Sequence, residues 1–138
     1  AEAVEKVGLS EGSEHVIKML NSGEGGQMIF EPAVIKVSVG DTIHFKATDA
    51  AHNSVSVDGM VPVGASSWAS QLSQDISITL DTEGVYVYQC DPHLIMAMVG
   101  VIQVGEAVNM DEIKSAASSY SSNFLMNNDR LQSYLSQL

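Results

Sequence analysis

Cysteine is nearly absent from this chain of 138 residues, which contains only Cys90. One cysteine cannot form a disulfide within the chain, so a hydrophobic core must hold the fold. A chain of this length can bury roughly two-thirds of its unfolded surface, which is enough for one domain. Long hydrophobic runs are also absent. None approaches the ~20 residues of a membrane-spanning helix, so we expect a soluble protein.

Basic residues are scarce as well. The chain has six lysines and arginines against 17 aspartates and glutamates, which gives a formal net charge of −11. No basic residue occurs between Lys46 and Lys114. Because nucleic acids and anionic membranes are bound through clustered cations, this distribution argues against both kinds of partner. The acidic surface either keeps the protein in solution or steers a cationic partner toward it.

Residues 14–105 have the pattern of short β-strands. They are rich in valine, isoleucine and tyrosine, and Gly-Asp, Asp-Gly and Glu-Gly pairs interrupt them. The predicted strands cover residues 15–20, 33–39, 42–47, 53–57, 75–80, 85–90 and 98–104. Seven or eight strands in about 90 residues predict a mainly β protein, a β-sandwich. Residues 1–13 are small, polar and acidic, and we expect them to form a flexible or loosely docked N-terminal arm.

Residues 106–138 change to a helical pattern. Asn109 followed by Glu112 resembles a capping box, which predicts a helix that ends near Ser118. Ser122 can cap a second helix, which carries a stripe of mostly apolar side chains. This stripe comprises Phe124, Asn128, Leu131, Leu135 and Leu138. We expect two α-helices that pack on the sandwich, so that the chain forms one domain.

The stretch QCDPHLIMAMVG, residues 89–100, combines the residue types that bind a soft metal. Cys90 is followed by His93 after three positions, by Met96 after six and by Met98 after eight. A thiolate, an imidazole and a thioether together favour copper. Two histidines, one cysteine and a weak axial methionine are the ligands of blue-copper electron-transfer sites.

The second histidine of such a site must come from another part of the sandwich. His52 is the best placed, because it lies in the loop ATDAAHN between two predicted strands. His15 and His44 lie within predicted strands, and His44 alternates with apolar neighbours, so it is expected to face outward. A backbone N–H near Asn53 can hydrogen-bond the sulfur of Cys90 and tune the site.

Other chemistries fit these residues less well. A cysteine–histidine nucleophile needs an orienting group and an oxyanion hole, and no convincing third member is present, so we expect no enzyme. A structural zinc site would use more cysteine or histidine and no methionine. Four histidines are too few for the additional clusters of a copper oxidase. Two interpretations stay open beside electron transfer: a copper carrier or storage protein that delivers metal, and a metal-free sandwich used for protein contacts.

The chain resembles the cupredoxins, and within them the pseudoazurins, from about Val16 to the C-terminus. The similar segments are MLNSGEGGQMIFEPAVIKVSVGDTI, the HN pair at 52–53, DGMVPVGA at 58–65, CDPHLIMAM at 90–98 and the two C-terminal helices. The resemblance implies a cupredoxin-type Greek-key β-sandwich of seven to eight strands. It also implies one type 1 copper ion, with His52, Cys90 and His93 as equatorial ligands and Met98 as the axial ligand.

Two methionines compete for the axial position. Amicyanin-like loops place the axial methionine three residues after the second histidine, and that spacing would select Met96. The pseudoazurin-like surroundings favour Met98 and leave Met96 in a hydrophobic surface patch.

The same resemblance implies a single-electron carrier of the bacterial periplasm, secreted with a leader that this chain lacks. Electrons would pass through the exposed edge of His93 to or from redox proteins such as cytochromes or nitrogen-oxide reductases. We expect a monomer, with an apolar collar around His93. The collar comprises Met28, Pro62, Pro92, Leu94, Ile95, Met96 and Ala97. The chain departs from the family in its longer N-terminal arm and in lacking the lysines that often surround the copper face.

Overall fold

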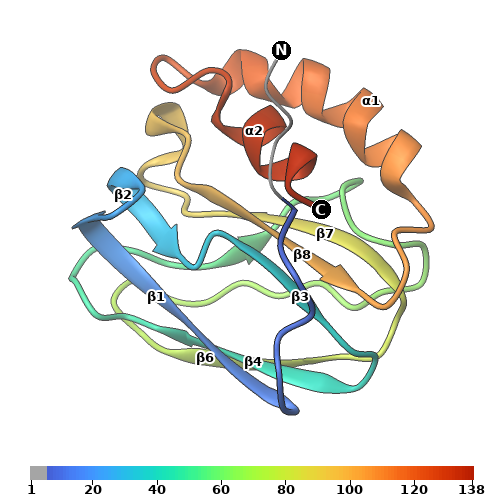
Figure 1. Ribbon diagram of the computed structural model, residues 1–138. Helices are drawn as coiled ribbons and strands as arrows, with labels where there is room; N and C mark the ends of the chain where they lie inside the picture. Colours follow the sequence, from blue (N-terminus) through green and yellow to red (C-terminus); the bar gives the residue numbers. More distant parts are fainter. Residues whose placement is uncertain (1–5) are drawn as a thin grey trace.

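The computed structural model describes residues 6–138, which form a sandwich of two four-stranded sheets with two helices on one side (Figure 1). The strands are β1 (Glu14–Gly23), β2 (Gly26–Glu31), β3 (Val34–Val37), β4 (Asp41–Lys46), β5 (Val55–Ser56), β6 (Ile76–Leu80), β7 (Gly84–Gln89) and β8 (Val99–Val104). One sheet has the order β2-β1-β4-β6, and the other has the order β3-β8-β7-β5. The predicted mainly β sandwich with two C-terminal helices is confirmed.

The burial pattern of the strands follows from their place in the layers. In β1, His15, Ile17 and Met19 are buried and alternate with exposed residues, because one face of this sheet meets solvent. β7 and β8 are buried along almost their whole length, because their sheet is covered on both faces. Alternate residues of β7 therefore pack into two different hydrophobic cores.

One core lies between the two sheets, and the other lies between the second sheet and the helices. Tyr86 and Tyr88 of β7 belong to the first core, together with the aromatic residues Phe30, Phe45 and Trp68. The valines that alternate with them belong to the second core. Its members include Val85, Val87, Val99, Val101, Ile113, Leu131 and Leu135. The period of two in GVYVYQ thus produces a three-layered molecule.

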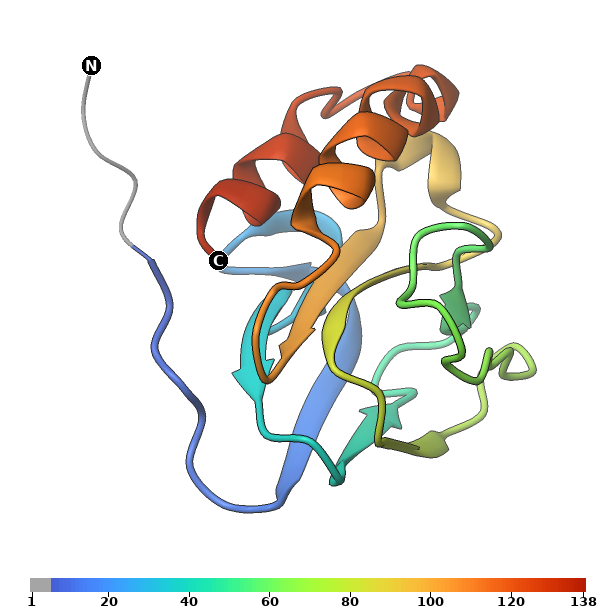
Figure 2. The ribbon, with the colours of Figure 1, turned by 90° about the vertical axis from the view of Figure 1, so that its right-hand side faces the viewer.

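The helices are α1 (Met110–Tyr120) and α2 (Arg130–Ser136), with 3-10 turns η1 (Leu94–Met96) and η2 (Ser121–Asn123). Four members of the predicted stripe, Phe124, Leu131, Leu135 and Leu138, are buried, and Asn128 is exposed. The predicted helix start at Ser122 is wrong, because residues 121–123 form the short turn η2 and α2 begins only at Arg130. Figure 2 shows both helices stacked on the same side of the sandwich.

The predicted capping box is also wrong, although α1 does begin after Asn109. The Asn109 side chain makes no capping hydrogen bond to its helix. Its Oδ1 accepts from the Val85 N–H at 2.7 Å, and its Nδ2 donates to the Val85 carbonyl at 3.0 Å. Asn109 therefore ties the start of α1 to β7 instead of capping the helix.

Two strands, β2 and β5, depart most from the prediction. β2 was not expected, and it pairs antiparallel with the second half of β1. β5 is reduced to Val55 and Ser56, because the residues before it bond to other loops. Asn53 contacts Asp91 and Ser70, and the Ser54 N–H donates to Ser70 Oγ at 2.8 Å.

The N-terminal segment from residue 6 onward lies against the sandwich and the end of the chain. The Val7 N–H donates to the Gln137 carbonyl at 2.8 Å, and Leu9 forms a parallel bridge with Lys36. Residues 1–5 of the predicted arm lie outside the described residues. From residue 6 to 138, no helix combines the length and the apolar character needed to cross a membrane.

Candidate metal centre

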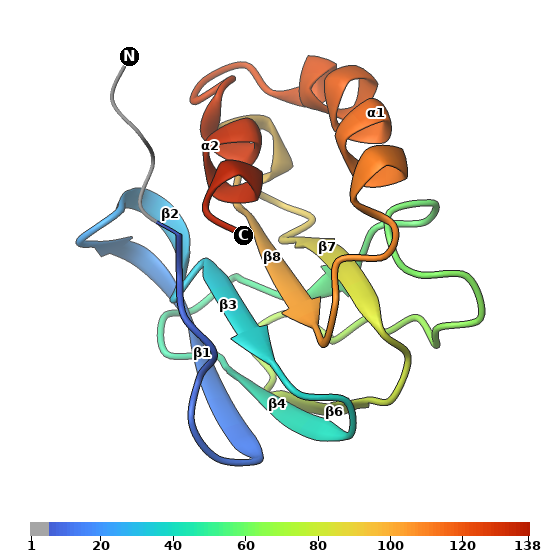
Figure 3. The ribbon, with the colours of Figure 1, turned by 45° about the vertical axis from the view of Figure 1, so that its right-hand side comes forward.

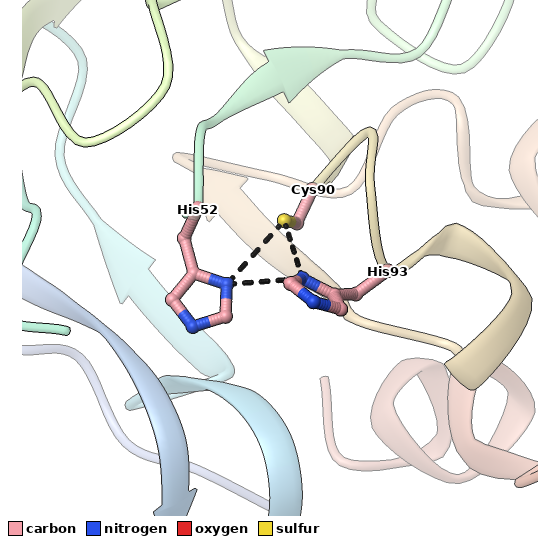
Figure 4. Close-up of side chains that lie close together, drawn as sticks. All are labelled: His52, Cys90 and His93. Atoms are coloured by element: carbon pink, nitrogen blue, oxygen red, sulfur yellow. Dashed lines mark hydrogen bonds between the residues drawn. The ribbon is translucent and has the colours of Figure 1, made fainter. Parts of the chain in front are cut away.

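Three of the predicted ligand residues meet beyond the C-terminal ends of β4 and β7. The Nδ1 atoms of His52 and His93 are 3.1 Å apart, and Cys90 Sγ lies 3.6 Å from the first and 3.4 Å from the second. Figure 4 shows these three atoms directed toward one another. Among residues 6–138, this is the one group of three or more histidine, cysteine or acidic side chains with metal-binding spacing.

The turn after β7 places Cys90 and His93 together. The Met96 N–H donates to the His93 carbonyl at 2.9 Å, and the Met98 N–H donates to the same carbonyl at 3.3 Å. The Cys90 N–H donates in turn to the Met98 carbonyl at 2.9 Å. The loop therefore closes on itself and brings the backbone of Met98 opposite Cys90.

His52 is held from both sides of its loop. Its carbonyl accepts from the Ser73 N–H at 2.9 Å, and the preceding Ala51 N–H donates to Ser73 Oγ at 2.8 Å. Its imidazole is fully buried, and Nε2 lies 2.8 Å from Oδ1 of Asn21. Because an amide oxygen only accepts, Nε2 carries the proton and Nδ1 presents a lone pair toward Cys90.

The electrostatics keep His52 in the form that binds metal. Burial lowers the pKa of His52, the neighbouring His93 lowers it further, and Asp49 only partly opposes them. The ring is therefore neutral at neutral pH, as a histidine ligand must be.

Cys90 is fully buried, and burial raises the pKa of its thiol. The backbone N–H groups of Asn53 and His93 act in the opposite direction and lower that pKa, while Asp91 raises it. The Asn53 N–H is the backbone group that the sequence predicted to act on this sulfur. A bound cation would supply the remaining stabilisation of the thiolate, because metal ions deprotonate a coordinating thiol.

The side chains of Asn53 and Asp91 tie the two ligand loops together. The Asp91 N–H donates to Asn53 Oδ1 at 2.8 Å, and Asn53 Nδ2 donates to the Asp91 carboxylate at 3.3 Å. This tie and the Asn21 contact were missed in the sequence, because both join residues more than 30 positions apart and leave no periodic signal. The HN pair was the only local hint.

The two methionines differ in burial. Met98 is fully buried in the same core cluster as Cys90, whereas Met96 ends η1 and is half-buried. The burial of Met98 beside Cys90 favours it over Met96 as a neighbour of the triangle.

The donor set fits copper. A triangle with sides of 3.1, 3.4 and 3.6 Å has its centre roughly 2 Å from each corner, which matches the ~2.0–2.3 Å bonds of nitrogen and sulfur to a small transition metal. Two imidazoles with one sulfur suit copper and do not suit Mg²⁺ or Ca²⁺, which require oxygen ligands.

The other two histidines have different partners. His15 Nε2 lies 2.8 Å from Asp41 Oδ2 in a buried hydrogen bond, and His44 lies between Ser77 and Glu14. Neither belongs to the group formed by His52, Cys90 and His93.

The predicted apolar collar needs correction at two positions. Pro92 and Ile95 are exposed, and Met28, Leu94 and Met96 are half-buried, but Ala97 is fully buried. Pro62 is also buried, and it packs against Gly84 at the start of β7, whereas Cys90 follows the end of that strand. Pro62 therefore lies at the end of the sandwich opposite to Cys90 and is not part of the collar.

Comparisons with known proteins agree with this site. Residues 17–105 match the family of copper binding proteins described as the plastocyanin/azurin family. The chain is 41% identical to the pseudoazurin of Paracoccus pantotrophus over 103 residues, which cover 74% of this chain and 71% of that one. The solved pseudoazurin of Methylobacterium extorquens AM1 has 37% identity and a TM-score of 0.79, covering 90% of this chain and 98% of that one. That of Hyphomicrobium denitrificans has 33% identity and a TM-score of 0.80, with 91% and 98% covered.

Proposed function

Because this chain belongs to the plastocyanin/azurin family of copper-binding proteins, and within it to the pseudoazurins, we propose that it is a single-electron carrier rather than an enzyme. It would hold one type 1 copper ion through His52, Cys90, His93 and Met98. The triangle of two imidazole nitrogens and one sulfur carries this proposal. When bound there, copper supplies one-electron chemistry between Cu(I) and Cu(II).

The surroundings of the triangle suit an electron carrier, because they hold the donor atoms still. Asn21 fixes the ring of His52, Ser73 fixes its backbone, and the Asn53–Asp91 pair joins the two ligand loops. Electron transfer is fastest when neither oxidation state demands rearrangement. A protein that delivers copper would instead need a route for the metal to leave, and both His52 and Cys90 are fully buried.

The edge of His93 is the proposed route for the electron. His93 is partly exposed, whereas His52 and Cys90 are not. Beside it, Ile95 is half exposed, and the Leu125 N–H donates to the Ile95 carbonyl at 2.7 Å. Leu125 and its neighbour Met126 are also exposed, so an apolar surface extends from the metal loop to the segment before α2. A small apolar contact of this kind suits the brief docking of redox partners.

The charges around this surface favour a basic partner. Asp49 acts electrostatically on His52, Asp91 acts on Cys90, and residues 47–113 contain no lysine or arginine. We propose a redox partner, a cytochrome or a nitrogen-oxide reductase, with basic side chains around an apolar centre. This differs from the acidic partners that lysine-ringed relatives would suit. A periplasmic location, as the resemblance to bacterial pseudoazurins implies, completes the proposal.

Titration of the metal-free protein with Cu(II) tests the proposed function. We expect one copper per chain and intense visible absorption from thiolate-to-copper charge transfer, which bleaches on reduction and returns on oxidation. A colourless complex that gives up its copper to weak chelators would contradict electron transfer and support the delivery alternative.

Electron self-exchange tests the proposed route without a named partner. Ile95→Asp should slow self-exchange by about tenfold or more, because two copies then meet with like charges in the contact. Val63→Asp is the matched control, because Val63 is fully exposed and follows Pro62 at the other end of the sandwich. Equal rates for the two variants would remove the apolar surface beside His93 from the route.

Salt dependence tests the partner. Electron exchange with a basic cytochrome should slow as ionic strength rises, because salt screens the attraction beyond ~8 Å at physiological strength. The same exchange with an acidic cytochrome should accelerate. A rate with the basic cytochrome that stays flat or rises would leave the acidic surface with a solubilising role only.

A further inference from the structure

The loop that carries the metal ligands is held from outside by the segment before α2. Three consecutive carbonyls of the loop, those of Ile95, Met96 and Ala97, accept hydrogen bonds from residues 125–130. The Leu125 N–H donates to Ile95 at 2.7 Å, and Asn127 Nδ2 donates to Met96 at 3.2 Å. Figures 1 and 3 show η1 beside the start of α2.

Arg130 makes the most extensive of these contacts. Its Nη1 donates to the carbonyls of Met96 and Ala97 at 3.4 and 3.2 Å and to that of Met28 at 3.1 Å, and Nη2 donates to Gln27 at 3.3 Å. This guanidinium therefore donates to four backbone carbonyls, although the chain contains 17 acidic residues that could accept from it. The planar fork of arginine can bridge two segments in this way, and the single ammonium of lysine cannot.

The backbone at these carbonyls needs support. Met28 and Ala97 have φ angles of 52° and 59°, and Asn127, beside Arg130, has a φ of 55°. Residues with a side chain seldom adopt this left-handed conformation, and they keep it only where the surroundings hold them. Arg130 bonds to the carbonyls of both Met28 and Ala97, so it is placed to stabilise β2 and the metal loop at once.

We propose that Arg130 is a positioning residue for the metal site, which it fixes through the carbonyls of Met96 and Ala97. Met98 follows Ala97 directly, and its backbone bonds to both His93 and Cys90. Release of Ala97 would therefore loosen Met98 and, through the same hydrogen bonds, the turn of His93. On this proposal, which rests on the proposed copper site, the C-terminal helical segment is part of the metal centre.

Amide hydrogen exchange of the metal-free protein tests this role directly. The variants are Arg130→Lys, which keeps the charge, Arg130→Gln, which removes it, and Asn127→Gly, which allows the positive φ but removes one donor. Lys114→Gln is the control, because it removes one exposed charge from α1. We expect the amides of Ala97 and Met98 to exchange about ten- to a hundredfold faster in both Arg130 variants. Asn127→Gly should show a smaller acceleration, and Lys114→Gln none.

The amides of Val87 and Val101, in the centre of the second sheet, serve as the internal reference. If they accelerate as much as those of Ala97 and Met98 in all three variants, Arg130 is a general stabiliser and the proposal is overturned. Unchanged exchange at Ala97 and Met98 in both Arg130 variants would overturn it as well.

The copper-loaded variants give a second readout that a merely structural role would not move. Both Arg130 variants should still bind one copper, with a changed ratio of visible absorption bands and a shifted reduction potential, whereas Lys114→Gln should match the parent protein. Identical spectra and potentials in all proteins would contradict positioning. Failure of the parent protein to develop colour would instead contradict the proposed function, and the exchange rates of the metal-free chain would still decide the role of Arg130.

Discussion

Two buried histidines, His52 and His15, lie in the same sandwich and differ in the side chain that their Nε2 atoms contact. His52 donates from Nε2 to the neutral amide of Asn21, which leaves Nδ1 facing the sulfur of Cys90. His15 places Nε2 against the carboxylate of Asp41 at 2.8 Å. The first arrangement prepares a neutral ring to bind a cation, and the second uses the ring in an internal hydrogen bond to a carboxylate. Residue type alone therefore does not make a histidine a ligand: His52 lies beside Cys90 and His93, and His15 is not part of that group.

The largest expected effect is confined to the site formed by His52, Cys90 and His93. Cys90→Ser should abolish the visible absorption of the copper protein, because the charge-transfer band requires the thiolate. Asp41→Asn, the matched change beside His15, should leave that absorption intact. An absorption spectrum of each variant with one equivalent of copper checks this, and a coloured Cys90→Ser protein would remove Cys90 from the ligand set.

The Asn21 contact is the next test. Asn21→Ala should weaken copper binding by about 10- to 100-fold, because the partner that orients a histidine ligand is lost. Ser22→Ala, at the exposed neighbouring position of β1, is the control and should bind like the parent protein. Competition with a chelator of known affinity measures both. Equal affinities would show that the buried loop alone orients His52.

The His15 site should respond in stability rather than in metal binding. Asp41→Asn should lower the free energy of unfolding by about 2 kcal/mol, because the His15 and Ser38 N–H groups lose a charged acceptor. Urea denaturation of the metal-free protein measures this. A loss below about 0.5 kcal/mol would mean that the pair contributes no more than an exposed ion pair.

The same pair predicts an acid dependence of stability. Burial raises the pKa of Asp41, but hydrogen bonds from His15 and Ser38 outweigh it, so the net pKa is below the ordinary value of 3.8. A carboxyl with a lowered pKa stabilises the fold fully above its unfolded value, and this contribution is lost as pH falls through the folded value. Stability should therefore fall more steeply below pH 3.8 in the parent protein than in Asp41→Asn. Parallel stability curves in that range would contradict the assignment.

The smallest expected effect concerns a buried polar group with no partner. Among the described residues, the Tyr88 hydroxyl has no hydrogen bond, whereas the Tyr86 hydroxyl donates to the Thr82 carbonyl at 2.6 Å. Tyr88→Phe should stabilise the fold by about 1 kcal/mol, and Tyr86→Phe should destabilise it by a similar amount. Thermal or urea unfolding separates the two, and destabilisation by Tyr88→Phe would show that its hydroxyl has a partner.

The sequence predicted the features that depend on local spacing. Cys90, His93 and Met98 stand in one short loop, and the period of two in the strands predicts the layers. The position of His52 in a loop between two predicted strands was also sufficient to identify it as a candidate ligand, because the chain has only four histidines. The contacts of Asn21, Asn109 and Arg130 could not be predicted, because each joins its partner across 24 or more residues.

Short polar side chains also have more than one possible use, which explains the wrong capping box. Asn109 stands where a helix cap is expected, and its amide bonds to β7 instead. Gly100 in β8 also has a role that its residue type does not reveal. A Cβ there would collide with the hydroxyl of Tyr88, so this glycine makes room for a large side chain on the neighbouring strand.

A crystal structure of the copper-loaded protein, with the metal located by anomalous scattering, tests the central claim most directly. We predict one copper ion between Nδ1 of His52, Nδ1 of His93 and Sγ of Cys90, with the thioether of Met98 as the fourth ligand. The positions of these three donors should differ little from those in the metal-free protein. Copper bound elsewhere, or a fourth ligand supplied by Met96, would contradict this account.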